Sequence, residues 1–533
     1  MTANPGRLAA LLCVVFALLA GSAMLRTSTT FDEIVFPAVG ARGMTTGDFS
    51  MVNDHPRLAQ YAYGLPLYLA QVRYPEEEGY RWNWYSRYQY SEALYWASGN
   101  SGDQVAVLAR LVGLLFGTLT VVATFLLARR HMPPGAALLA AAMVAFTPDM
   151  LAHAGVAYND VPLAFGMLVS VYALDGVVRR PSTRSAILAA LAFTLAVCFK
   201  YSGLILLPVL VALVMLEALG GRWRERAWLG ALARAAGVFA AIVYALIAVM
   251  YSCDWLLTEY MSGIAEISVP ALTGGRTAFL LGDHRQGGWW YFFPVAFALK
   301  TPVGLHVLAL LAIAAGILAA RSGTLRAWAS HPARAPALAA ALMLAVMMAA
   351  RMNIGTRHAL PVVPLACILI AQGVAWWSAR GARWLVPVAA TALVAMAAST
   401  LRYYPYFLSY LSEYAYGRPV HETLVDSNTD WGHGLVALRE YMRANGIDRV
   451  ALGYFGTAMP QGYGIEYVAL PSYFWVERED PGKPPPRYTV VSATLLAGSY
   501  LRGDPYARLR KVKPVAVVGG SLYIFDSQAM QRH

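Results

Sequence analysis

Charged residues are scarce in this sequence. Asp, Glu, Lys and Arg together make up 14% of its 533 residues, whereas a soluble globular chain contains roughly 25%. A chain so poor in charge does not have the composition of an ordinary water-soluble domain.

Cysteine pairs and phosphate-binding loops are lacking as well. The cysteines Cys13, Cys198, Cys253 and Cys367 have no paired spacing, which excludes a disulfide framework and a cysteine-ligated zinc site. The sequence also has no internal repeat and no glycine-rich loop of the Walker type. The latter absence excludes a P-loop nucleotide hydrolase.

Long apolar segments are abundant instead. Hydrophobic residues make up 58% of the chain, and the mean hydropathy is +0.48. Segments of this kind are long enough to cross a bilayer as helices, so we predict an α-helical polytopic membrane protein with about eleven transmembrane helices. The predicted spans are 8–26, 105–128, 135–153, 160–178, 185–200, 203–219, 228–251, 301–320, 335–350, 359–378 and 384–402.

The arginines of the connecting segments are distributed unevenly. Nearly all lie in every second gap, at 129–130, 179–184, 222–226, 321–334 and 380–383. Loops rich in Lys and Arg mark the cytoplasmic side. We therefore predict a plasma (inner) membrane protein with a cytoplasmic N-terminus and, because the number of spans is odd, an extracytoplasmic C-terminus. The net charge of +12 is a topology signal and does not indicate a nucleic-acid partner.

The first apolar segment admits two interpretations. Arg7 followed by the run from Leu8 to Leu25 is also the pattern of a cleaved signal peptide. However, the run is about long enough to span a bilayer. Asp32-Glu33 follows shortly after it, and a retained helix would hold this acidic pair at the membrane surface. We therefore predict an uncleaved first span.

The predicted outer side carries two long loops and a terminal domain. Loops 27–104 and 252–300 are rich in aromatic residues, Tyr80 and Trp82 among them, which favours interfacial helices. Residues 1–402 form the predicted transmembrane catalytic domain. Residues 403–533 lack an apolar span, and we predict an extracytoplasmic α/β domain there. Its expected elements are a helix at 435–443 and strands at 450–455, 488–492 and 515–525, the last a hairpin around Gly519-Gly520.

Acidic residues lie close to the outer ends of the predicted spans. Asp32 and Glu33 suit a general base for an acceptor hydroxyl, although an acid at this place also suits a helix N-cap. Asp54-His55 suits the positioning of a phosphate or a sugar hydroxyl, and equally an ordinary turn. Asp160 follows Tyr158-Asn159 at a span junction, where an ionisable group must face a cavity or a partner.

Cations end apolar segments on the same side. Lys200 and Arg357-His358 suit the neutralisation of a phosphate leaving group. The alternative is that each side chain snorkels to the lipid headgroups. Their grouping with Arg276 and Arg285, on a side otherwise poor in cations, favours a phosphate site.

In this order, the segments resemble the GT-C membrane glycosyltransferases, in particular the protein O-mannosyltransferase-like group that includes the lipid A aminoarabinose transferases. No single motif is specific, but the ordered set is. The resembling segments are 32–33, 53–56, 157–162, 199–203, 287–294, 299–302, 353–358, 360–364, 430–435 and 454–456.

The resemblance implies a mannosyltransferase-like enzyme that transfers a hexose or pentose from a polyprenyl-monophosphate donor at the outer leaflet, with inversion. Its acceptor is a glycan, a lipid or a protein. No nucleotide and no essential metal ion are implied, because cationic side chains can assist the departing phosphate. The pattern departs from the family at His55-Pro56-Arg57, where a second proline is usual. The implied catalytic residues are Asp32, Glu33 and Asp160, and the implied substrate-binding residues are Asp54, His55, Tyr158, Asn159, Lys200, Arg276, Arg285, Arg357 and His358.

Two other functional classes compete with this one. A secondary transporter would have ionisable residues near mid-span and often internal repeats. A GT-C enzyme with a lipid-diphosphate donor, such as an oligosaccharyltransferase, would have metal-ligand acids and a Trp-Trp-Asp-Tyr-Gly motif. Only Trp289-Trp290-Tyr291 and Asp430-Trp431-Gly432 partly resemble that motif.

Overall fold

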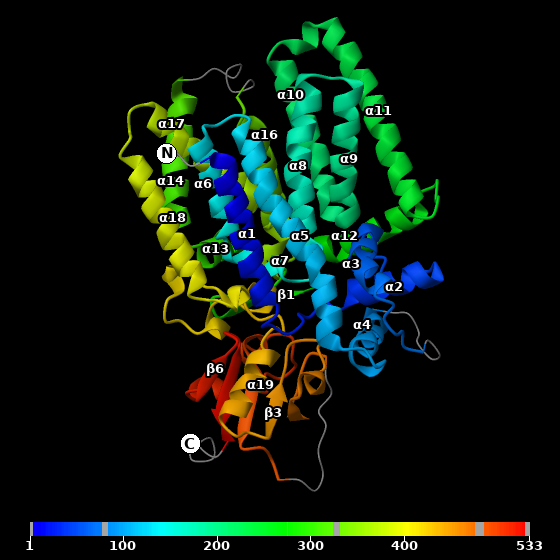
Figure 1. Ribbon diagram of the computed structural model, residues 1–533, viewed down its shortest axis with the longest axis vertical. Coiled ribbons are helices and arrows are strands. Elements are labelled where there is room, and N and C mark those ends of the chain that lie inside the picture. Colours follow the sequence, from blue (N-terminus) through cyan, green and yellow to red (C-terminus); the bar gives the residue numbers. More distant parts are fainter. Residues whose placement is uncertain (1–3, 77–83, 274–275, 323–330, 475–483, 528–533) are drawn as a thin grey trace.

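Long helices form a bundle, and a small α/β domain packs against one end of it (Figure 1). The computed structural model describes residues 4–76, 84–273, 276–322, 331–474 and 484–527. The chain begins at the bundle end remote from the α/β domain, so the N-terminus and the C-terminal domain lie at opposite ends (Figure 1).

The predicted apolar segments are all helical. Among the described residues, seven helical segments have the length and composition of a membrane span. A bent pair, α6 (Pro134–Ala145) and α7 (Pro148–Ala154), is an eighth candidate, and α9 (Thr183–Phe199), α16 (Arg334–Ala349) and α18 (Leu385–Leu401) are shorter apolar helices. The multi-pass fold is thus confirmed, while the count of eleven spans stays a prediction. The seven are α1 (Pro5–Met24), α5 (Gly102–Arg129), α8 (Asp160–Arg179), α10 (Leu206–Leu219, with the preceding turn Tyr201–Ile205), α11 (Arg226–Met250), α14 (Val303–Ser322) and α17 (Val362–Ala379).

The break between α6 and α7 has a local cause. Pro148 occupies the first turn of α7 and cannot continue the helix before it, because proline lacks the amide hydrogen. The two helices meet at 61°. The bend divides predicted span 135–153, and the second helix carries Asp149 in its first turn. Asp149 joins a buried network described below.

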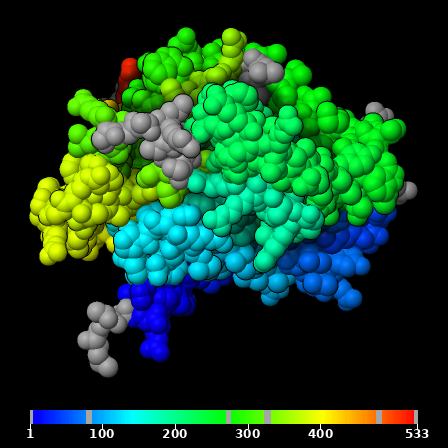
Figure 2. Space-filling view, turned by 90° about the horizontal axis from the view of Figure 1, so that it is seen from above, coloured from blue at the N-terminus to red at the C-terminus, as the bar shows by residue number. Residues whose placement is uncertain are grey.

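The arginine-rich connections gather at the bundle end remote from the α/β domain. Arg222 donates a hydrogen bond to the carbonyl of Arg179 (2.7 Å), and Arg179 donates one to the carbonyl of His331 (3.0 Å). Figure 2 shows this end, with α1 at its edge and the region around α18 and α11 on opposite sides. The geometry agrees with the alternation in the sequence, whereas the orientation in the membrane stays a prediction.

Short helices and a hairpin occupy the other end of the bundle (Figure 1). Helices α2 and α3 pack backbone to backbone, because a Cβ on Gly40 would lie 1.9 Å from the Gln60 carbonyl oxygen. Helices are thus present in both predicted outer loops; Tyr80 and Trp82 lie outside the described residues. The elements are α2 (Val35–Thr46), α3 (Arg57–Leu69), α4 (Trp84–Glu92), α12 (Thr258–Thr273), β1 (Thr277–Leu280), β2 (Asp283–Gln286) and α13 (Phe292–Lys300).

The C-terminal domain is a mixed five-stranded sheet in the order β4-β3-β5-β7-β6, covered by α19 (Leu435–Ala444). The predicted helix and the three strand regions are confirmed, including the hairpin, whose turn uses Gly519 and Gly520 at positive φ. One edge strand, β4, and the short helix α20 (Ala493–Leu496) were not predicted. The strands are β3 (Arg449–Gly453), β4 (Glu466–Ala469), β5 (Tyr488–Ser492), β6 (Ala516–Val518) and β7 (Leu522–Asp526).

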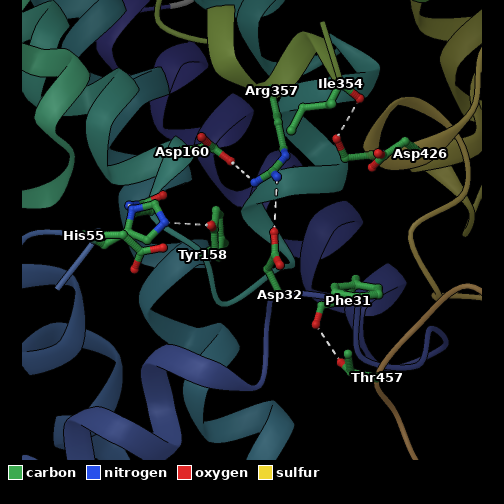
Figure 3. A network of polar contacts seen from close by, with 12 residues as sticks. Phe31, Asp32, His55, Tyr158, Asp160, Ile354, Arg357, Asp426 and Thr457 are labelled. Atoms are coloured by element: carbon green, nitrogen blue, oxygen red, sulfur yellow. Dashed lines mark hydrogen bonds and ion pairs between the residues drawn. The ribbon is translucent and has the colours of Figure 1, made fainter. Parts of the chain in front are cut away.

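This domain holds the segment that links α1 to α2. Residues 28–31 run along residues 431–433, with further contacts to Thr457 and Tyr463. Asp32 follows directly, so the position of a predicted catalytic acid depends on the C-terminal domain. The hydrogen bonds are Ser28 N to His433 O (3.1 Å), Ser28 Oγ to Gly432 O (2.8 Å), Phe31 N to Trp431 O (2.8 Å), Thr29 N to Tyr463 Oη (3.1 Å) and Thr457 Oγ1 to Phe31 O (2.6 Å; Figure 3).

Candidate active site

Asp32 lies in the turn before α2. That helix begins at Val35, and its N-cap is Ile34, with no side-chain hydrogen bond; the interpretation of Asp32 as a helix cap is therefore wrong. The Asp32 carboxylate instead accepts a hydrogen bond from the Tyr88 hydroxyl (2.8 Å) and pairs with Arg357 (3.2 Å; Figure 3). A fifth of the side chain is exposed, 20%, so the group remains accessible.

Arg357 is the centre of the site. It lies in the turn between α16 and α17, and its guanidinium reaches Asp32 Oδ2 at 3.2 Å and Asp160 Oδ2 at 3.3 Å (Figure 3). The rings of Tyr158 and Trp431 lie against it, with centroids 4.9 and 4.2 Å away. Burial opposes its charge, but Asp160, Tyr158 and Asp32 raise the pKa of Arg357 above its ordinary value. The Arg357 side chain therefore remains positively charged.

Lys200 completes the group. It ends α9 and forms a buried ion pair with Asp160, the first residue of α8. Lys200 and Arg357 both point into the protein and are buried, so the interpretation that they snorkel to headgroups is wrong. We call Asp32, Asp160, Lys200 and Arg357 the site cluster. Its two carboxylates and two cations balance, as buried charges require.

His55 adjoins this cluster as a neutral base. Its Nε2 lies 3.2 Å from the Tyr158 hydroxyl, and its Nδ1 lies 3.2 Å from Asn159 Nδ2. The Asn159 amide also donates to the Phe199 carbonyl (3.0 Å), which fixes the amide orientation and makes His55 Nδ1 an acceptor, with the proton on Nε2. Burial lowers the pKa of His55 to about 4, so the ring is uncharged at neutral pH.

The other residues of the early loop serve to hold it. Both oxygens of Asp54 pair with Arg87 of α4, at 2.8 and 3.2 Å. Arg57, where the family pattern has proline, pairs with Glu259 and donates to Ser252 (3.1 Å). This arginine therefore links the first outer loop to the second.

Glu33 differs from its neighbour Asp32. It is fully buried, pairs with Arg110 (2.6 Å), and accepts hydrogen bonds from the amides of Thr30 (2.8 Å) and Ala157 (3.1 Å). These partners engage both carboxylate oxygens. The geometry favours a role for Glu33 in fixing the Asp32 turn.

The remaining predicted cations lie around the cluster. His358 is half-buried beside Arg357, and burial together with Lys200 and Arg357 lowers its pKa well below the ordinary value. Arg276 is exposed at the start of the β1–β2 hairpin, and its charge interacts with the Asp426 and Asp32 carboxylates. Arg285 lies on the exposed strand β2, opposite Ala278.

Four residues of the site were not predicted: Tyr88, Trp431, Asp426 and Tyr500. Asp426 has a left-handed backbone (φ 57°) and accepts hydrogen bonds from the Tyr500 hydroxyl and the Ser427 amide. Burial raises the pKa of its carboxyl. A strained, buried acid next to a site is a functional candidate, and the signal in the sequence was the Asp-rich stretch 426–430.

A second buried network holds the turn that carries Arg357. Lys300, at the end of α13, donates to the carbonyls of Leu408 (2.8 Å), Tyr410 (3.1 Å) and Asn428 (2.6 Å). It also pairs with Asp149 (3.1 Å), whose other oxygen accepts from the hydroxyl of Thr356 (2.7 Å), the residue before Arg357. Lys300 therefore ties the turn of Arg357 to the chain that leads into the C-terminal domain.

The described helices form a polytopic membrane bundle with a buried acid–cation cluster at its domain-facing end. Residues 9–257 match the family model of the dolichyl-phosphate-mannose–protein mannosyltransferases. This segment carries Asp32, His55, Asp160 and Lys200. Over that segment, the match agrees with the resemblance to the protein O-mannosyltransferase-like group of membrane glycosyltransferases.

The chain is also similar to solved structures of membrane transferases. With ArnT from Cupriavidus metallidurans bound to undecaprenyl phosphate it shares 14% identity over 98% of each chain, with a TM-score of 0.48. With the S. cerevisiae protein O-mannosyltransferase Pmt1-Pmt2 complex bound to the sugar donor it shares 19% identity over 48% of this chain and 34% of that one, TM-score 0.35. With the Archaeoglobus fulgidus oligosaccharyltransferase it shares 10% identity over 76% and 60%, TM-score 0.44. Among curated proteins, no sequence matches this chain significantly.

Proposed function

We propose that this protein transfers a sugar from a polyprenyl-monophosphate donor to an acceptor hydroxyl on the extracytoplasmic side of the membrane, with inversion at the anomeric carbon. The observation that carries the proposal is the position of Arg357 between Asp32 and Asp160, with Lys200 on the far side of Asp160. A base, a phosphate site and a balancing acid thus meet within one cluster.

Binding of the donor phosphate releases the Asp32 carboxylate from its ion pair with Arg357. A polyprenyl phosphosugar is a phosphodiester with one negative charge, and it competes with the Asp32 carboxylate for Arg357. Once Arg357 turns to the phosphate, the hydrogen bond from Tyr88 is the one side-chain contact that Asp32 keeps among the residues the structure describes. Donor binding therefore frees the base that the acceptor needs.

In the transfer step, the acceptor oxygen attacks the anomeric carbon while the bond from that carbon to the phosphate oxygen breaks. The bonding electrons remain on the phosphate, which becomes a dianion, and Lys200 and Arg357 stabilise this developing charge. The acceptor proton passes to Asp32. Asp160 holds both cations in place, since it contacts each of them.

The neighbouring groups have supporting roles in this scheme. His55, Tyr158, Asn159 and His358 are neutral donors or acceptors that suit sugar hydroxyls, and Arg276 and Arg285 suit an anionic part of a substrate near the exposed hairpin. Glu33 and Asp54 position the loops through their arginine partners. Because cationic side chains assist the phosphate, we propose that transfer needs no nucleotide and persists in EDTA.

The function is tested with purified protein, a radiolabelled polyprenyl-monophosphate sugar, and membranes of a deletion strain as the acceptor source. We expect label to enter a glycan, lipid or protein fraction and free polyprenyl phosphate to accumulate. A polyprenyl-diphosphate sugar is the matched control. Turnover with the diphosphate donor alone would replace this proposal by the oligosaccharyltransferase-like alternative.

The orientation is tested by cysteine labelling in intact cells, in a Cys253→Ala background. A reagent that does not cross the membrane should label Arg508→Cys and not Arg184→Cys, both exposed positions. Labelling of Arg184→Cys alone would reverse the topology.

A further inference from the structure

A cavity of about 430 Å³ lies in the C-terminal domain, between residues 417–422 and the sheet edge formed by β6 and β7. Its walls are mostly apolar and include Val420, Leu496, Leu509 and Phe525. None of the residues of the site cluster lines it. Cavities of this size and character hold small ligands in other proteins.

The cavity lies next to the ends of the apolar helices. Just before it in the chain, Ser412 donates to the Leu299 carbonyl (2.7 Å), and Glu413 accepts from the amide of Val303, the first residue of α14 (3.1 Å). Tyr414 packs on His306 of α14, with ring centroids 5.4 Å apart. The cavity lining starts at Gly417, only a few residues from these contacts, which places it within about 15 Å of the helix end.

Exposed aromatic residues lie near the same helix ends. Tyr414 is 58% exposed and Tyr416 is 75% exposed, and the guanidinium of Arg402, at the end of α18, lies over Tyr416 at 5.0 Å. Exposed tyrosines and arginines at helix ends are typical of the level of the lipid headgroups. The cavity therefore opens where a phospholipid headgroup can reach it.

Basic residues outnumber acidic ones around the cavity, although Glu422 also lines it. Arg418 and Arg510 line it, and Lys511 and Lys513 are exposed beside it in the chain. Arg510 is held in place by Asp504 and by the Leu496 carbonyl (2.9 Å). His421, a lining residue only 7% exposed, has ring nitrogens without a hydrogen-bond partner among the described residues; the Glu422 carboxylate lies 3.8 Å from its Nε2.

We propose that this cavity binds the headgroup of an anionic phospholipid, with the phosphate at Arg418 and Arg510 and the glycerol and upper acyl carbons against the apolar wall. Bound lipid seats the C-terminal domain against the membrane. The proposal rests on the cavity and on the adjacent helix ends, and it does not depend on the sugar-transfer reaction.

The test compares lipid nanodiscs of phosphatidylcholine with nanodiscs containing phosphatidylglycerol. We expect phosphatidylglycerol to raise the Tm of the wild-type protein and to remain bound to it in native mass spectra. Arg418→Gln should weaken this retention about fivefold, the effect of one cation near an anionic surface. Val517→Phe, which fills the cavity at a half-exposed edge-strand position, should abolish it without unfolding the domain.

The matched control is Arg502→Gln, which removes an exposed arginine that does not line the cavity. Equal retention of phosphatidylglycerol by the wild type, Arg418→Gln and Val517→Phe would overturn the proposal. Full competition by millimolar inorganic phosphate would also overturn it, because the ligand would then be a soluble anion. Loss of retention in the first two variants and not in the control would establish the site.

Discussion

Helix α8 connects two buried charge clusters at opposite ends of the bundle. At its start, Asp160 belongs to the site cluster. Near its end, Asp175 pairs with Arg334 (2.6 Å) and Arg179 (2.8 Å), and Arg334 also pairs with Glu217 of α10. We call the latter group the helix clamp. Both clusters consist of acids and arginines or lysine in ion pairs, yet their surroundings differ.

The members of the helix clamp lie at helix positions, and Arg334 is 0% exposed. The members of the site cluster come largely from turns: Asp32 precedes α2, Arg357 lies in the turn Thr356–Ala359, and Lys200 follows the last residue of α9. Aromatic faces lie against Arg357, and Asp32 is partly open. Burial of an ion pair therefore does not distinguish the two clusters. The partly exposed acid Asp32 beside Arg357 does distinguish them.

The largest expected effect is that of Asp32→Asn. The rate should fall by on the order of 10²–10⁴, because the base is lost, while Tm stays unchanged, since the amide still accepts from Tyr88. Turnover and thermal unfolding are measured on the same purified sample. Glu33→Gln is the matched neighbour and should instead lower Tm, because Arg110 loses its partner. Near-normal turnover of Asp32→Asn would leave the site cluster with a structural role like that of the helix clamp.

Arg357→Gln should have the next largest effect. The variant loses the cation that we propose binds the donor and stabilises the departing phosphate, so kcat should fall roughly 10²- to 10³-fold and the donor KM should rise. Initial rates over a range of donor concentrations separate the two. Arg222→Gln, a half-exposed arginine at the other end, is the control. A change in stability without a change in these constants would contradict the assignment.

Lys300→Met tests a positioning role. Its loss frees Asp149 and Thr356, so Arg357 is no longer fixed, and misplacement of this kind costs up to roughly 10²-fold in kcat. Donor KM should change less than kcat, because Arg357 itself remains. Lys300→Arg should restore part of the rate. If both variants lower Tm alone, Lys300 serves only to hold the fold.

Asp175→Asn should show the reverse pattern to Asp32→Asn. Breaking a buried pair costs about 3–5 kcal/mol of stability, whereas turnover per folded molecule should stay near the wild-type value. Thermal unfolding measures the loss of stability, and activity normalised to folded protein measures the turnover. Lost turnover at an unchanged Tm would extend the reaction machinery to the remote end of the bundle.

The smallest effect concerns pH. Burial raises the pKa of Asp430 to about 7, above its ordinary value in an unfolded chain. The folded state therefore holds the proton more tightly, and this contribution to stability is present at low pH and is lost as pH rises toward 7. Asp430→Asn should match the wild-type Tm below about pH 4, the ordinary pKa of an aspartate, and exceed it by a growing margin as pH rises to about 7. A gap that is constant from pH 5 to 8 would contradict this.

Short segments of the sequence were enough to predict the membrane fold and part of the candidate site. Apolar runs and the position of Asp160, Lys200 and Arg357 at their ends are properties of short segments. The structure brings these three residues together, while their role as a site stays a prediction. The sequence treats Asp32 and Glu33 as equivalent neighbours. They are distinguished only by what lies opposite, Arg357 in one case and Arg110 in the other.

Other parts of the site have no local signal. Trp431 covers Arg357, yet it belongs to the C-terminal domain, which the predicted boundary at residue 402 separates from the transmembrane domain. Tyr88 reaches Asp32 across 56 positions, and Tyr500 reaches Asp426 across 74. Such pairs depend on how the outer loops and the C-terminal domain fold together, which neither hydropathy nor turn propensity reports.

The contact between residues 28–31 and residues 431–463 bears on how the protein is made. The turn of Asp32 is synthesised among the first residues, but the strands and loops that hold it are synthesised after the last apolar helix. A ribosome must therefore finish nearly the whole chain before the reactive centre takes shape. An incomplete polypeptide lacks the contacts that hold residues 28–31, so we expect prematurely terminated chains in the membrane not to carry out the proposed transfer.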